Sequence, residues 1–202
     1  MLAIDYALAP ENKFPTQCDQ MLGVWRHVAA HAASLGVDAA RIAVGGDSAG
    51  ARLSLALALD ARVAGSDEHP AICAQLLYYG GYGLKDSMSR RLYGWADLDG
   101  LGDDDTATLR SLYLARPEDA DHLRNDLLKA DMAGLPATFI GACTYDPLRD
   151  DSLALAALLQ ERGVRHELKQ YSGVLHACLH YSALEPIAMQ AIEDGAAFLR
   201  GL

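Results

Sequence analysis

Short apolar runs of strand type alternate with helical patterns along most of this chain, and this alternation is the feature that most constrains its fold. Because strands that alternate with helices usually form parallel sheets, we expect an α/β fold: a mainly parallel sheet of about five strands with flanking helices. The expected strands are residues 2–6, 42–46, 71–78, 137–143 and 165–171. One expected helix begins near Pro15 and ends before Gly36. Three more are expected at residues 49–64, 151–162 and 184–199.

The segment between the third and fourth expected strands, residues 80–135, interrupts this rhythm. It contains Trp95, the acidic stretch DLDGLGDDD and a helical pattern near residues 104–115. Connections longer than about 12 to 15 residues in compact domains are often lids or binding loops. We therefore expect a helical insert that forms a partial cap within a single domain of residues 1–202. A purely structural excursion is the alternative.

Composition excludes several classes of partner. The 202 residues include 17 Lys and Arg against 27 Asp and Glu, a formal net charge of −10, so nucleic acid and anionic membrane surfaces are not expected partners. No apolar run approaches the roughly 20 residues of a membrane span, and residues 1–11 lack the pattern of a secretory signal. A cytoplasmic protein is expected. Its four scattered cysteines, with no CxxC pair, are expected to be buried thiols: Cys18, Cys73, Cys143 and Cys178.

Residues 46–50 read Gly-Asp-Ser-Ala-Gly, a G-x-S-x-G motif. The motif lies between an expected strand and an expected helix, which is the setting of a nucleophilic serine on a tight turn. Small residues at Gly46 and Gly50 allow the strand and the helix to approach closely. The free N–H of Ala49 at the helix start is expected to donate to a developing oxyanion. The alternative is that Ser48 only caps the helix.

A serine hydroxyl becomes a strong nucleophile when a base takes its proton and a third group orients that base. Asp146 and His176 each follow an expected strand, so both are expected at the same edge of a parallel sheet. The order Ser48, Asp146, His176 is that of the catalytic triad in α/β-hydrolases. Asp150 and Asp151 compete with Asp146, but their position favours a charge in the first turn of the next helix. For His176, a purely structural role is the alternative.

His176 and His180 are four residues apart, a spacing that places two metal ligands on one helix face. A metallohydrolase is therefore the alternative chemistry. The segment HACLH lacks the Glu of the HExxH motif, and no further cluster of ligands is apparent except the aspartates 146, 150 and 151. We expect no metal and no cofactor.

Four segments, DYALAPENKFP, GDSAGA, DPLRDD and GVLHACLHYS, resemble the hormone-sensitive-lipase family of α/β-hydrolases. Within it, YYGGYGLKDSMSRRL and LHACLHYS look like the bacterial acetyl esterase subgroup. The resemblance extends essentially from end to end of the chain. It implies an α/β-hydrolase fold and a carboxylesterase for short acyl chains. It also implies Ser48 as nucleophile, His176 as general base and then acid, and Asp146 as the orienting carboxylate.

One motif of that family is missing. Family members carry an HGGG-type motif upstream of the segment that resembles DYALAPE, and no HGG occurs in this sequence. The loss of one oxyanion donor typically lowers turnover about 10²- to 10³-fold. The second hypothesis is therefore a catalytically impaired binding or assembly module. The family's early strands would also be missing. The exposed sheet then predicts either a homodimer that covers it or a fragment of a longer protein.

The expected ligand is a small-molecule ester. If the insert acts as a lid, its apolar residues and those near His176 are expected to form the wall of an acyl pocket, although packing on the body of the domain is the alternative. The residues expected to bind substrate are Asp47, Tyr82, Leu84, Met88, Trp95, Leu175 and Leu179. The chain length of the acyl group does not follow from the sequence.

Overall fold

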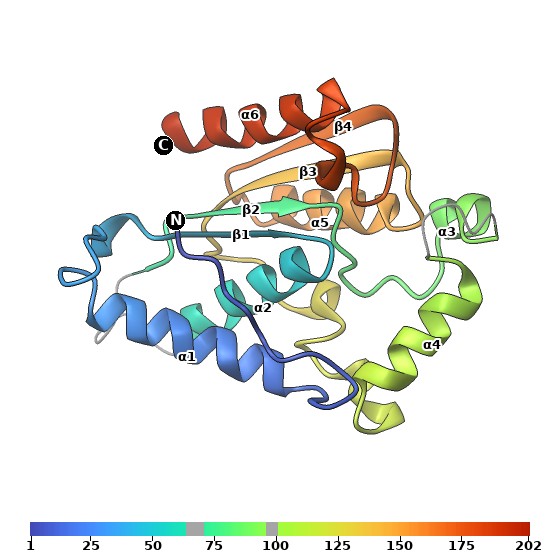
Figure 1. Cartoon of the computed structure of the whole chain (residues 1–202), viewed down its shortest axis with the longest axis horizontal. Helices are drawn as coiled ribbons and strands as arrows, with labels where there is room; N and C mark the ends of the chain where they lie inside the picture. The colour runs from blue at the N-terminus through green and yellow to red at the C-terminus, as the bar shows by residue number, and fades with distance from the viewer. Residues whose placement is uncertain (64–70, 96–100) are drawn as a thin grey trace.

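Four parallel strands form one sheet in the order β1-β2-β3-β4 (Figure 1). The computed structural model describes residues 1–63, 71–95 and 101–202. Because the strands are parallel, their carboxyl ends lie at one edge of the sheet. The residues that directly follow them are therefore brought together there: Ser48, Tyr79, Asp146 and His176. The strands are β1 (Ala43–Asp47), β2 (Ala74–Tyr78), β3 (Ala137–Tyr145) and β4 (His166–Leu175).

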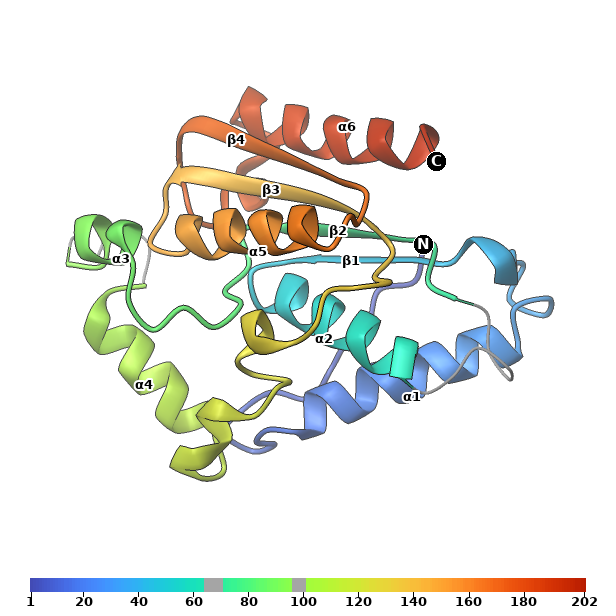
Figure 2. The ribbon, with the colours of Figure 1, turned by 180° about the vertical axis from the view of Figure 1, so that it is seen from behind.

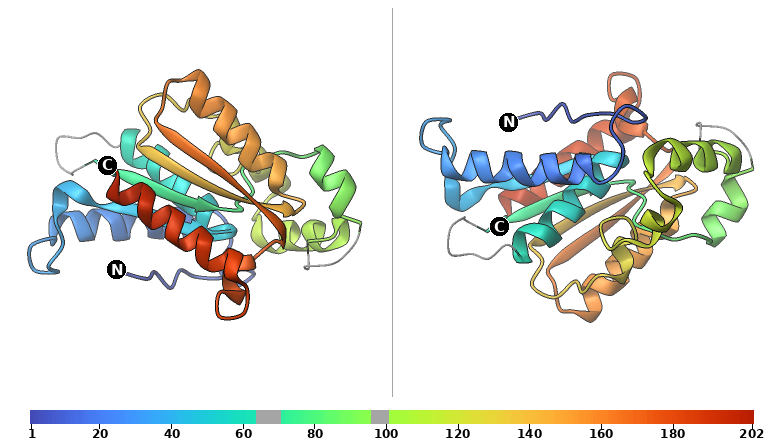
Figure 3. Two further views of the ribbon diagram at one scale, coloured as in Figure 1. Left: turned by 90° about the horizontal axis from the view of Figure 1, so that it is seen from above. Right: turned by 90° about the horizontal axis from the view of Figure 1, so that it is seen from below.

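Helices cover both faces of this sheet, as the views from above and below show (Figure 3). No helix in the described ranges is long and apolar enough to cross a membrane. The α-helices are α1 (Thr16–Ala30), α2 (Ala49–Val63), α3 (Met88–Tyr93), α4 (Asp103–Tyr113), α5 (Arg149–Glu161) and α6 (Pro186–Arg200). The short 3-10 helices are η1 (Ala39–Arg41), η2 (Pro117–Asp121), η3 (Leu127–Lys129) and η4 (Cys178–Tyr181).

The two faces of the sheet have separate cores, since side chains alternate along each strand. Leu77 and Ile140 belong to the core formed with α1, α2 and α5. Their neighbours Tyr78 and Phe139 belong to the core that α6 covers. Helix α2 packs against the sheet on one side and against α1 on the other, which explains why its run LSLALAL is apolar on nearly every side.

The parallel α/β fold expected from the sequence is confirmed, with four strands in the described residues where about five were expected. Residues 2–6 were expected as the first strand and are not one. Side chains of α1 hold the segment that follows: Gln20 Oε1 accepts from the Ala7 N–H at 2.9 Å, and Gln17 Nε2 donates to the Ala7 carbonyl at 2.9 Å. These contacts direct the backbone to α1, and within the described residues β1 is an edge strand.

Residues 80–135 contain α3, α4, η2 and η3, and α3 and α4 lie beyond the carboxyl ends of the strands (Figure 2). Asp151, at the start of α5, connects this segment to the rest of the domain. Its Oδ1 accepts hydrogen bonds from the N–H groups of Tyr82, Gly83 and Leu84 at 2.7 to 3.1 Å. Its Oδ2 accepts from Arg90 Nη2 at 2.9 Å.

Asp150 makes a similar connection, since its Oδ2 accepts from the Ser89 N–H at 2.9 Å. Both aspartates lie in the first turn of α5, as expected, but their carboxylates bind the segment 80–135, which the sequence did not indicate. Burial raises the pKa of Asp151, while Arg90 and the three amides favour its ionised form. This carboxylate is completely buried, so its partners are needed to offset the loss of hydration.

The cysteines are free thiols, and three of them are buried as expected. Cys73, just before β2, is exposed, which corrects the expectation for that residue. Cys143 and Cys178 are in contact, with their sulfur atoms 3.4 Å apart. Burial raises the pKa of the Cys18 thiol to about 11, so this side chain packs as an uncharged apolar group.

Replacement of Asp151 tests the role of this buried ion pair. Asp151→Ala removes the acceptor of three amides and leaves Arg90 without its partner, so we expect the free energy of unfolding to fall by about 3 to 5 kcal/mol. Urea denaturation measures it. The matched control is Asp121→Ala, which breaks an exposed pair with Lys85 and is expected to leave the free energy of unfolding nearly unchanged, because solvent screens this pair. Equal losses in the two variants would contradict this role.

Candidate active site

Ser48 lies on the sharp turn between β1 and α2. Its φ of 49° is in the left-handed region, which a non-glycine residue adopts only when its surroundings hold it there. The Ser48 N–H donates to the Tyr78 carbonyl at 2.9 Å, which fixes the turn to the end of β2. The motif at Ser48 thus adopts the strand-turn-helix geometry expected from the sequence.

The two glycines of the motif have different roles. A Cβ at Gly46 would lie 2.5 Å from the carbonyl carbon of Gly50, so strand and helix can meet only because Gly46 has no side chain. A Cβ at Gly50 would meet nothing within 4 Å. Both glycines were expected to allow the close approach of strand and helix, but the structure requires a glycine only at position 46.

His176 connects Ser48 to Asp146. Its Nε2 lies 2.8 Å from Ser48 Oγ, and its Nδ1 lies 2.9 Å from Asp146 Oδ2. The second oxygen of Asp146, Oδ1, accepts from the Leu148 N–H at 2.7 Å. The imidazole ring also makes an edge contact with the ring of Tyr79, at 5.0 Å between centroids. The structure thus brings together the three residues that the sequence placed in a triad.

This arrangement determines what the imidazole can do. The ionised carboxylate of Asp146 only accepts hydrogen bonds, so Nδ1 carries the proton directed at it. Nε2 is then free to accept the proton of Ser48 Oγ. Asp146 is fully buried and His176 is 7% exposed, so both groups are held with little competition from water.

Ala49 begins α2 next to the serine and lines the same pocket. Within the described residues its N–H has no hydrogen-bond partner, as is usual for the first amide of a helix. The donor expected for an oxyanion is therefore free in this structure.

Asp47 lies outside the pocket lining, which differs from its expected place in a substrate site. Its Oδ2 accepts from Tyr79 Oη at 3.2 Å and lies 3.1 Å from His180 Nε2. His180 thus contacts Asp47, while both nitrogens of His176 contact Ser48 and Asp146. The two histidines do not form a shared ligand pair. Among the described residues, no group of three His, Cys, Asp or Glu side chains is arranged to hold a metal ion.

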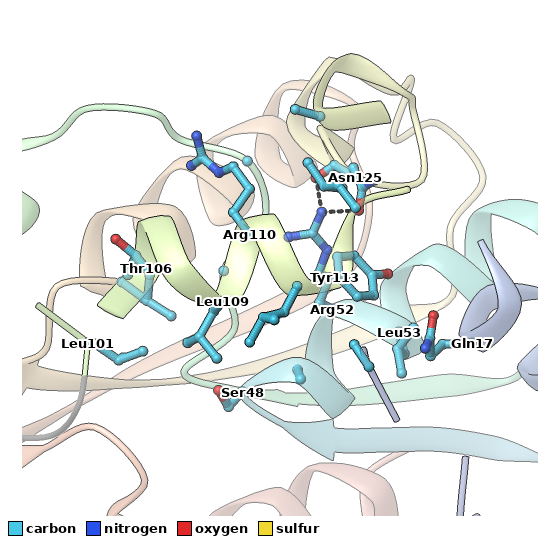
Figure 4. A pocket seen from close by; sticks show the side chains of 18 of the residues that line it. Gln17, Ser48, Arg52, Leu53, Leu101, Thr106, Leu109, Arg110, Tyr113 and Asn125 are labelled. Atoms are coloured by element: carbon cyan, nitrogen blue, oxygen red, sulfur yellow. Dashed lines mark hydrogen bonds between the residues drawn. The ribbon is translucent and has the colours of Figure 1, made fainter. Parts of the chain in front are cut away.

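A pocket of about 470 Å³ opens beside Ser48 (Figure 4). Among the residues expected to bind substrate, Leu84 lines it. Tyr82 is fully buried in the core, and Trp95 is 77% exposed. Leu175 is exposed outside the lining, and Leu179 packs on the core under α6. Met88 is also exposed and outside the lining. Of the residues expected to bind substrate, Leu84 is thus the one that lines this pocket, and a substrate role for the others stays a prediction.

The sequence analysis missed most of the pocket wall. It comes from the N-terminal segment, α2, α4 and the loop after η2, whose contributions include Tyr6, Arg52, Leu109, Tyr113 and Asn125. A usable signal existed for Arg52, since it is a charged residue one turn after Ser48 and directly precedes the apolar run LSLALAL. For the other four no local pattern indicates that they meet.

Comparison with known proteins agrees with this geometry. Residues 1–180 match the family described as alpha/beta hydrolase fold. The chain belongs to this family. Acetyl esterases of Salmonella paratyphi A and Salmonella typhi are 40% identical to this hydrolase-family chain, over 98% of its residues. The chain spans 61% of the length of these curated relatives.

Solved structures show the same likeness. An esterase of Pyrobaculum calidifontis is 33% identical, with a TM-score of 0.92 over 98% of this chain and 64% of its own. A thermostable carboxylesterase cloned from a metagenomic library is 32% identical, with a TM-score of 0.92 over 98% of this chain and 67% of its own. The resemblance to α/β-hydrolases of the acetyl esterase type is thereby confirmed.

The unequal glycines give a test of the turn at Ser48. Gly46→Ala forces β1 and α2 apart, and we expect a loss of about 1 to 3 kcal/mol in the free energy of unfolding, as for overpacking of a core. Gly50→Ala is the control, and in a helix this change is expected to add up to about 1 kcal/mol. Thermal and urea denaturation of both variants measure the difference. A Gly46→Ala protein as stable as the wild type would contradict the close approach.

Proposed function

We propose that this chain carries the reaction centre of a serine carboxylesterase for short-chain acyl esters. The observation that supports it is the continuous hydrogen-bonded series from Ser48 through His176 to Asp146, at 2.8 and 2.9 Å. Curated relatives named acetyl esterase and solved esterase structures favour the same reaction class. The roles of the three residues follow from their positions in that series.

In the first half-reaction, Ser48 Oγ attacks the carbonyl carbon of the ester while its proton passes to His176 Nε2. Asp146 holds the opposite N–H and stabilises the imidazolium that forms. The carbonyl oxygen becomes negatively charged and accepts a hydrogen bond from the Ala49 N–H. His176 then gives its proton to the departing alcohol oxygen as the C–O bond breaks, and the acyl group stays on Ser48.

In the second half-reaction, water attacks the acyl carbon and its proton passes to His176 Nε2. The bond to Ser48 Oγ breaks, the serine takes the proton back, and the carboxylic acid leaves. No step uses a metal or a cofactor. Ala49 is one oxyanion donor, and an oxyanion hole usually has two or more, so we expect slow turnover by this chain alone.

The pocket is large enough to hold an ester with a short acyl group. Its volume of about 470 Å³ lies in the lower half of the range for small-molecule sites. Leu84 and the apolar side chains of α4 form part of its wall, and segment 80–135 thus acts as a partial cap over the reaction centre. The cap belongs to the same α/β-hydrolase domain.

The first test is hydrolysis of p-nitrophenyl acetate by the wild type and by Ser48→Ala. We expect the variant to lose turnover, because the acyl-enzyme cannot form without Oγ. His31→Ala is the control, since it removes an exposed histidine at the end of α1 that lies outside the pocket lining, and it is expected to keep the wild-type rate. A fluorophosphonate probe followed by mass spectrometry reports whether Ser48 is the reactive residue.

Equal hydrolysis by wild type and Ser48→Ala would contradict the esterase proposal. Together with no labelling of Ser48, it would favour the catalytically impaired binding or assembly module.

We also propose that a second copy of the chain covers β1. This strand pairs with β2, and no described strand pairs with its other side. An open edge presents unpaired N–H and C=O groups that a second chain can bind. Light scattering is expected to give twice the mass of the chain, and Ala43→Lys on this exposed edge is expected to weaken the dimer. A monodisperse monomer at high concentration would contradict the proposal.

A further inference from the structure

The charge of the pocket is opposite in sign to the charge of the chain. The chain has a net charge of −10. Among the described residues that line the pocket there is no Asp or Glu, but there are four cationic side chains: Arg52, Lys85, Arg90 and Arg110. An apolar cleft lined by one sign of charge concentrates ligands of the other sign.

Two of these cations are already neutralised. Arg90 pairs with the buried Asp151 at 2.9 Å, and Lys85 pairs with the exposed Asp121 at 2.5 Å. Their positive charge is largely compensated before any ligand enters.

Arg52 is different. Its Nη2 donates to the backbone oxygen and to Oδ1 of Asn125, at 2.6 and 2.5 Å, and both of these acceptors are neutral. Its Nε is buried without a partner, and within the described part of the chain no carboxylate lies within ion-pair distance of it. Guanidinium groups stay charged in proteins, so this partly buried cation has lost water without gaining an anion.

The surroundings of Arg52 also disfavour the charge on its guanidinium group. Burial lowers the pKa of Arg52 and the charge of Arg110 adds to this effect, while Tyr113, Cys18 and the more distant Asp151 oppose it. Arg110 is exposed on α4, and no ion pair of its side chain is recorded among the described residues. An anion in the pocket would therefore relieve two positive charges.

The position of Arg52 connects it to the reaction centre. Arg52 lies in the first turn of α2, and its N–H donates to the Ser48 carbonyl at 3.2 Å, so Arg52 stands one helical turn after the serine. Both line the same pocket, and Figure 4 shows the Arg52 guanidinium beside Tyr113, directed at Asn125. A ligand bound at Ser48 therefore reaches Arg52 through a short spacer.

We propose that the preferred substrates carry a carboxylate a few bonds from the ester carbonyl, and that Arg52 binds this carboxylate. A singly charged group fits, because Arg52 is the uncompensated cation inside the pocket and Arg110 lies at its exposed side. Nη2 already donates to Asn125 and Nε is buried, so the remaining amino group of Arg52, Nη1, is the donor to a carboxylate oxygen. This inference rests on the esterase proposal for its chemistry, while binding of the anion does not depend on turnover.

The test compares two chromogenic esters of similar length, mono-p-nitrophenyl glutarate and neutral p-nitrophenyl pentanoate. We expect the wild type to favour the glutarate in kcat/KM by at least about tenfold. Arg52→Met, which keeps the length of the side chain without its charge, is expected to abolish this preference. The matched control is Arg62→Met, on the same helix outside the pocket, where the side chain binds the carbonyls of Asp131 and Ala133. It is expected to keep the wild-type ratio.

A binding measurement separates this inference from the esterase proposal. Glutaramate, a monoanion that the enzyme cannot cleave as an ester, is titrated into Ser48→Ala and into Ser48→Ala/Arg52→Met by calorimetry. We expect at least about tenfold weaker binding to the double variant. Turnover without preference for the glutarate, or equal binding of glutaramate by both proteins, would overturn the role of Arg52. Binding that depends on Arg52 with no turnover of either ester would overturn the esterase proposal alone.

Discussion

The close contact between β1 and α2 is the constraint on which the site depends. Strand and helix meet at Gly46 with so little space that a methyl group there would lie 2.5 Å from the backbone of Gly50. At this turn Ser48 adopts a left-handed conformation, and its hydroxyl projects away from the sheet toward His176. The same turn leaves the Ala49 N–H free and directs α2 through the core. One tight junction therefore positions the serine, an oxyanion donor and Arg52.

The parallel sheet positions the other two residues of the triad. Asp146 and His176 are separated by a helix and a strand in sequence, yet they meet because β3 and β4 end at the same edge. The register between these strands is irregular between Cys143 and Tyr145. Beyond that point β4 continues to Leu175, so His176 is carried forward to reach both Ser48 and Asp146. The direction of the strands and the length of β4 together therefore determine where Asp146 and His176 meet.

Several parts of this structure could be predicted from the sequence, because their signals are local. Apolar runs mark the strands, and Ser48, Asp146 and His176 are each polar residues that follow such a run; their chemical roles stay predictions. Residues 2–6 also form an apolar run, but a strand needs a hydrogen-bonding neighbour, and α1 binds the following backbone instead. The residues that line the pocket were mostly not predicted, since the pocket joins segments far apart in sequence, such as Tyr6 and Leu109. Tyr82 shows the difficulty: an aromatic residue in a loop is equally suited to a pocket and to the core.

Residues 146–151 serve two purposes at once, and this limits how a family of such proteins can diversify. Asp146 orients the imidazole, Leu148 lines the pocket, and Asp151 holds the backbone of residues 82–84. A mutation that reshapes the pocket through this segment also moves the carboxylate behind His176. Changes on α4 or in the N-terminal segment alter the pocket without touching the triad. We expect natural variation in ligand selectivity to accumulate on those two elements, while residues 146–151 change slowly.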